Sequence, residues 1–126
     1  MSILFYICSF LTASLHVFFF YLESLVFHKE EVYTRFLVTP DTVEAVQLWA
    51  YNQGFYNLLL ALIIFFGLIQ LMRSKNSGIH YIRAASFVCF FAGVALFFSA
   101  PELQKSAIIQ STPALLCFLL SFLKKT

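Results

Sequence analysis

The sequence predicts an all-α fold, a transmembrane bundle of four helices. Hydrophobic residues make up 61% of the chain and charged residues only 11%. A soluble domain carries roughly 45–50% apolar and about 25% charged residues, so this composition cannot supply a water-facing surface. In addition, apolar runs near the length of about 20 residues that crosses a bilayer occur four times in 126 residues.

The four apolar runs give the predicted spans of one domain that covers residues 1–126. These spans are residues 3–27, 51–72, 81–99 and 106–123. Residues 28–50 form the longest connection and are predicted to lie outside the membrane. Within this loop, Thr39-Pro40-Asp41 is typical of a helix start, with a hydroxyl cap followed by proline and an acid, so the second helix is expected to begin near Pro40. Gly54 is a candidate bend in that helix.

Lysine and arginine predict the orientation in the membrane, because basic residues concentrate on the cytoplasmic side. Four crossings place both termini and the second connection on one side. That side holds Arg73, Lys75, Arg83, Lys124 and Lys125. The opposite side holds Lys29, Arg35 and Lys105. We therefore predict a multi-pass protein with both termini in the cytoplasm.

Several classes of site are not predicted. Cys8, Cys89 and Cys117 each lie in an apolar run without metal-binding spacing, which predicts buried thiols. His16 and Glu23 are two helical turns apart, too far to hold one ion by themselves. The net charge of +2 forms no basic face, so nucleic acid is not an expected partner. No motif for a cofactor is present.

Polar residues inside the predicted spans are the candidate site, because such groups are costly in a bilayer unless they are paired or wetted. The candidate ligand-binding residues are His16, Glu23, Asn52, Gln53, Tyr56, Asn57 and Gln110. His16 and Glu23 share one face of the first helix and are the catalytic candidates. The predicted orientation puts Glu23, the 52–57 cluster and Gln110 in the outer half of the membrane. Three helices would then contribute to one polar layer.

Several short motifs resemble a family of small bacterial membrane proteins, catalogued as domain of unknown function thirteen-oh-four. They are His16 with Tyr21-Leu22-Glu23, the run Asn52-Gln53-Gly54-Phe55-Tyr56-Asn57, Phe36 and Pro40 in the first loop, and Gln110 with Pro113-Ala114-Leu115. The resemblance covers nearly the whole chain, and Ser111 replaces a glycine usual in the family. It implies four helices in the bacterial inner membrane and no established activity.

Two kinds of role stay open for the polar layer. In the first, it is a pocket that binds or acts on a small apolar or lipid-like molecule, with Glu23 and His16 moving a proton and the amides orienting a polar head. In the second, the polar residues serve helix packing in an accessory or transport subunit, alone as a homo-oligomer or with a membrane partner protein. The lipid bilayer is a partner in both.

Overall fold

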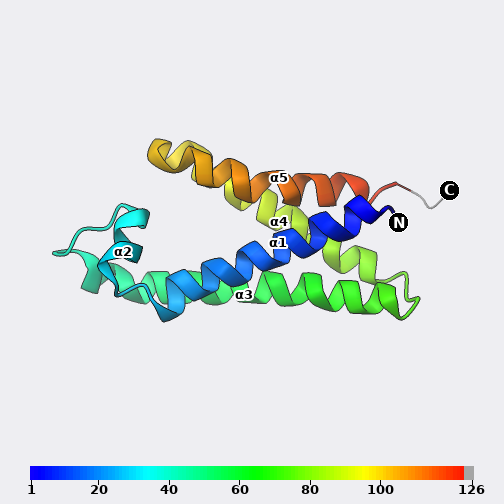
Figure 1. Ribbon diagram of the computed structural model, residues 1–126, viewed down its shortest axis with the longest axis horizontal. Helices are drawn as coiled ribbons and strands as arrows, with labels where there is room; N and C mark the ends of the chain where they lie inside the picture. Colours follow the sequence, from blue (N-terminus) through cyan, green and yellow to red (C-terminus); the bar gives the residue numbers. More distant parts are fainter. Residues whose placement is uncertain (124–126) are drawn as a thin grey trace. The chain divides into compact units, whose positions relative to one another are not determined.

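The computed structural model describes residues 1–123, and nearly all of this range is helical (Figure 1). No strand occurs among these residues, which confirms the all-α prediction. The long helices are α1 (Ile3–Phe20), α3 (Val43–Met72), α4 (Gly78–Ser99) and α5 (Gln104–Leu120). The shorter elements are a π-helical turn (Tyr21–Leu25), α2 (Glu30–Tyr33) and two 3-10 turns (Thr34–Phe36 and Pro101–Leu103).

Four segments of the described chain are long and apolar enough to cross a bilayer. They are Ile3–Leu25, Val43–Met72, Gly78–Ser99 and Pro101–Leu120. Each also carries large apolar side chains that are exposed, such as Phe18, Leu62, Phe91 and Ile108. Apolar surface of this kind is stable against lipid tails and not against water. The chain is therefore a multi-pass membrane protein whose spans contact the bilayer.

The second helix extends well before the predicted span. α3 begins at Val43, close to the start expected near Pro40, after a turn in which the Thr39 amide donates to the Thr42 hydroxyl at 3.2 Å. The predicted connection 28–50 thus contains α2 and the first turns of α3. Gly54 lies inside the continuous helix and does not interrupt it.

The chain divides into two compact units. The first, here called the core unit, comprises Met1–Leu15 and Leu60–Thr126. The second, the polar unit, comprises His16–Leu59. Since α1 and α3 each continue from one unit into the other, both helices contribute a section to each.

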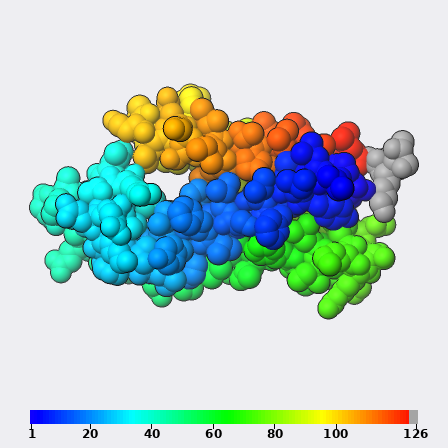
Figure 2. All heavy atoms as spheres, viewed as in Figure 1, coloured from blue at the N-terminus to red at the C-terminus, as the bar shows by residue number. Residues whose placement is uncertain are grey.

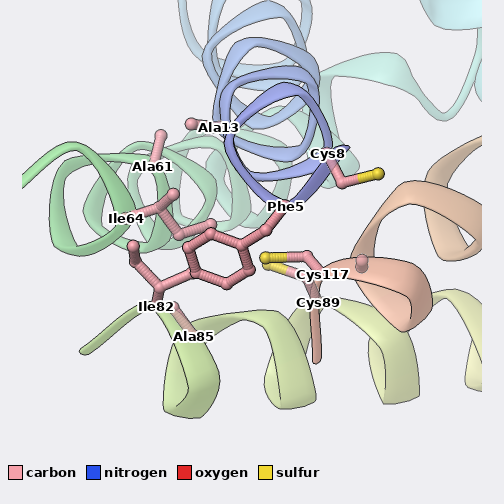
Figure 3. Close-up of a cluster of buried hydrophobic side chains, with 10 residues drawn as sticks. Phe5, Cys8, Ala13, Ala61, Ile64, Ile82, Ala85, Cys89 and Cys117 are labelled. Atoms are coloured by element: carbon pink, nitrogen blue, oxygen red, sulfur yellow. The ribbon is translucent and has the colours of Figure 1, made fainter. Parts of the chain in front are cut away.

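The core unit contains sections of all four long helices around one apolar cluster (Figure 3). Its buried members are Phe5, Cys8, Ala13, Ala61, Ile64, Ile82, Ala85, Cys89, Ala114 and Cys117. Most of these side chains are small, and small residues let membrane helices approach closely. All three cysteines are buried free thiols, as predicted.

Two glycines mark the closest approach of α3 and α4 in the core unit. A Cβ added at Gly67 would lie 2.6 Å from Cγ1 of Ile82 and 2.7 Å from the Gly78 carbonyl oxygen. A Cβ at Gly78 would in turn collide with the carbonyl oxygen of Gly67. The two backbones can touch only because both positions lack a side chain.

Hydroxyl and thiol groups connect three helices of the core unit. The Cys117 thiol in α5 lies 3.0 Å from the Ser9 hydroxyl of α1 and accepts a hydrogen bond from Ser86 of α4 at 3.2 Å. At the unit's end, Arg83 donates from Nη2 to the Ser121 carbonyl oxygen at 2.6 Å. Figure 2 shows the N-terminal residues beside the last turns of α5 at that end.

Candidate functional site

Glu23 lies in the π-helical turn that follows α1. The turn closes with a hydrogen bond from the Val26 amide to the Tyr21 carbonyl oxygen at 3.2 Å, five residues back instead of four. A π-turn inserts one extra residue into the helical repeat and rotates the following side chains around the axis, and such turns are frequent at functional sites. The Tyr21-Leu22-Glu23 motif is therefore carried by an irregular turn, which the sequence did not predict.

The π-turn packs closely against α3 within the polar unit. Asn57 donates from Nδ2 to Oε2 of Glu23 at 2.7 Å. One residue on, the Ser24 hydroxyl donates to the Tyr51 carbonyl oxygen at 2.9 Å. Gly54 permits this contact, because a Cβ there would collide with the Ser24 hydroxyl and lie 3.1 Å from Cβ of Glu23. Gly54, a candidate bend from the sequence, thus provides close approach here.

An open groove with a volume of about 630 Å³ runs along the polar unit. It is lined by Glu23, Phe27, Phe36, Val38, Val46, Trp49, Ala50, Asn52, Gln53 and Tyr56. This volume falls within the range of about 300–1,000 Å³ typical of small-molecule sites. The lining is also typical of them, since a few polar groups stand against a mostly apolar and aromatic wall.

The groove brings together four of the seven predicted site residues, namely Glu23, Asn52, Gln53 and Tyr56. Asn57 joins them through its hydrogen bond to Glu23. The Asn52 amide is itself held in place, because its Nδ2 donates to the Leu48 carbonyl oxygen one turn earlier at 2.8 Å.

The two other predicted residues lie elsewhere. His16 is buried in α1, with its ring 5.6 Å from that of Phe19 in an edge-to-face arrangement, and is not among the groove-lining residues of the described chain. Gln110 is buried in α5, in the core unit. A shared site of either residue with Glu23 stays a prediction.

The apolar wall of the groove was not predicted from the sequence. Phe27, Phe36 and Val38 come from the segment between the π-turn and α3, with the rings of Phe27 and Phe36 5.6 Å apart. The charges of residues 28–50 predict an extramembrane loop. Apolar residues are spaced among these charged residues, and this spacing was the available signal for an apolar wall. Phe36 is one of them and also belongs to the motifs that resemble the family.

Negative charge predominates in the polar unit. Residues 16–59 carry five acidic side chains and two basic ones, whereas the chain as a whole is positive by +2. Hydrogen bonds from the Thr39 side chain and from its own backbone lower the pKa of Asp41, so this exposed acid keeps its charge near neutral pH. Within residues 1–123, no group of three His, Cys, Asp or Glu side chains could hold a metal ion.

A family model for a protein of unknown function, DUF1304, matches residues 10–122. The chain belongs to this family. The match extends through both units and includes every residue that lines the groove. No curated protein and no solved structure matches the chain. Family membership therefore agrees with the resemblance seen in the motifs and assigns no activity.

Proposed function

We propose that this DUF1304 protein binds a small amphiphilic molecule in the groove of the polar unit. One observation carries the proposal: the Glu23 carboxyl lines a groove whose other wall is apolar. An ionisable group in a membrane span is costly unless a partner or a polar ligand compensates it. A ligand with one polar end and an apolar body matches both sides of this groove.

Each side of the groove has a distinct role in this proposal. Glu23, Asn52 and Gln53 receive the polar head, and Asn57 orients the Glu23 carboxyl by its 2.7 Å hydrogen bond. The apolar body packs on Phe27, Phe36, Val38 and Val46. Because Asn52 is held by the Leu48 carbonyl oxygen and Glu23 by Asn57, these two groups need little ordering when a ligand arrives.

Packing glue is the alternative for the same residues. The bond between Glu23 and Asn57 joins the π-turn to α3, and a bond of this kind contributes about 0.6–2 kcal/mol in membrane bundles. If Glu23 and Asn57 served helix packing alone, a groove beside the carboxyl would have no role. In the accessory role, a helix of a partner protein would occupy the groove. The experiment below distinguishes this role from ligand binding.

Native mass spectrometry of the gently purified protein, with extraction of bound molecules, tests the proposal. Ala50 lines the groove, whereas Ala45 on the same helix is exposed and does not. We expect Ala50→Phe to displace a co-purifying small molecule and Ala45→Phe to retain it. A co-purifying protein that Ala50→Phe releases would instead favour the accessory role. Wild-type protein without any bound molecule, and unresponsive to added amphiphiles, would contradict ligand binding.

We also propose that both termini face the cytoplasm. The turn 73–77 and the two ends of the described chain are near one another, since Met1, Ser74 and Leu123 line a common hollow. That side carries five of the eight basic residues, of which Lys124 and Lys125 lie outside the described residues. A reporter fused after Thr126 that is active only outside the cytoplasm would contradict this orientation.

A further inference from the structure

Two polar groups of the groove, Glu23 and Asn52, offer acceptors to a ligand. The Asn57 amide nitrogen is engaged with Oε2 of Glu23, and the Asn52 amide nitrogen with the Leu48 carbonyl oxygen. The hydrogen bond from Asn57 engages Oε2, one of the two oxygens of the Glu23 carboxyl. Oε1 of Glu23 and Oδ1 of Asn52 thus remain as acceptors for a ligand.

The charge around the groove has the same sign as these acceptors. No lysine, arginine or histidine is among its lining residues in the described chain. The polar unit as a whole has five acids against two bases, and Arg35 donates from Nε to the Glu31 carbonyl oxygen at 3.0 Å. A field of this sign concentrates cations and repels anions.

Aromatic rings complete the lining beside the carboxyl. Trp49 and Tyr56 belong to the same groove as Glu23. The face of an indole or phenol ring attracts an ammonium group through its quadrupole, and this attraction strengthens when the cation leaves water. Carboxylate, amide oxygen and aromatic rings are group types that bind a positively charged nitrogen.

We infer that the ligand of this groove is an amphiphile with a protonated amine head, which donates to Glu23 and Asn52 while its chain lies on the apolar wall. This inference rests on the proposed binding function and adds the chemistry of the head. A carboxylate or phosphate head is disfavoured, because it would lie beside the Glu23 carboxyl with no basic residue among the described lining residues.

Trp49 provides the measurement, because it is the chain's only tryptophan and lines the groove. The protein is placed in nanodiscs of uncharged phosphatidylcholine and titrated with terminally brominated undecylamine, undecanol and undecanoate, whose bromine quenches indole on contact. The double variant Trp49→Phe with Leu48→Trp puts the reporter at an exposed site that does not line the groove. Its quenching measures the contribution of the bilayer alone.

We expect saturable quenching of Trp49, with the amine binding about tenfold or more tighter than the alcohol, since a hydrogen bond between charged groups is stronger than one from a neutral hydroxyl. The carboxylate should bind more weakly than either. Glu23→Gln keeps an acceptor for Asn57 and should remove most of the preference for the amine. Gln53→Lys, at an exposed position of the groove, should shift the preference towards the carboxylate.

The failures are distinguishable. Carboxylate binding as tight as amine binding, or an amine preference that survives both Glu23→Gln and Gln53→Lys, would overturn the amine assignment and leave the groove as a binding site. Quenching that is no stronger than in the relocated-tryptophan variant for any of the three probes would refute the binding function itself.

Discussion

The two units of this membrane protein are built by different rules. In the core unit, small residues bring four helices together around Phe5 and three buried thiols. In the polar unit, an irregular turn and a short helix leave a groove of about 630 Å³ beside a carboxyl group. Close packing gives rigidity around that cluster, whereas the open arrangement of the polar unit places space beside a carboxyl group and side-chain amides.

The largest loss of unfolding free energy is expected from a substitution that disrupts the packing of the core unit. Phe5 is fully buried there, so Phe5→Ala leaves a cavity and should lower the free energy of unfolding by about 3 kcal/mol. Phe98 is 79% exposed, and Phe98→Ala should change it by only about 0.5 kcal/mol. Steric-trapping measurements in bicelles compare the two. Equal losses would mean that Phe5 is not central to the packing.

A matched pair of glycine substitutions sharpens the comparison. Gly67→Ala forces the α3 and α4 backbones apart and should cost about 2 kcal/mol of unfolding free energy. Gly54→Ala in the polar unit mainly displaces the Ser24 side chain, whose hydrogen bond to Tyr51 is worth about 1 kcal/mol.

The readouts of the two glycine variants should also differ. Gly54→Ala is expected to shift the emission of Trp49, which lines the neighbouring groove, and Gly67→Ala to leave it unchanged in the folded protein. An emission shift of the same size in both variants would show that the two units do not respond separately.

A smaller change in unfolding free energy distinguishes ligand binding from helix packing as the role of Glu23 in the polar unit. Asn57→Ala removes the bond to Glu23 and should lower the free energy of unfolding by about 0.6–2 kcal/mol, the range for hydrogen bonds between membrane helices. Glu23→Gln keeps an acceptor and should cost less. If Glu23→Gln costs as much as Asn57→Ala and changes no probe affinity, the residue serves packing only.

The smallest expected effect concerns pH and the turn before α3. The Thr39 side chain holds the pKa of Asp41 below its ordinary value, so the ionised acid favours the folded turn. This contribution is present above the unfolded pKa of about 3.9 and is lost as pH falls through the lower folded pKa. A carbon-13 NMR titration of the Asp41 carboxyl should show the low value, and Thr39→Ala should raise it. An unchanged midpoint in Thr39→Ala would contradict the assigned cause.

The polar residues of the candidate site could be predicted from the sequence, whereas its apolar wall and its π-turn could not. Glu23, Asn52, Gln53, Tyr56 and Asn57 stood out because polar groups are rare in apolar runs. The groove's apolar wall did not stand out, because Phe27, Phe36 and Val38 resemble ordinary loop or span residues until the chain folds back. The π-turn left no local signal either, since its residues also suit a regular helix.

The sequence alone determined that four apolar helices cross a membrane and which polar side chains they carry. These properties depend on composition and on the length of each run, and both can be read along the chain. The tertiary structure decided that Glu23 meets Asn57, that Gly54 serves close approach, and that the 28–50 connection supplies a wall of the groove. Such pairings depend on the rotation of each helix about its axis. One extra residue in the Tyr21–Leu25 turn changes that rotation by about 100°, which composition does not encode.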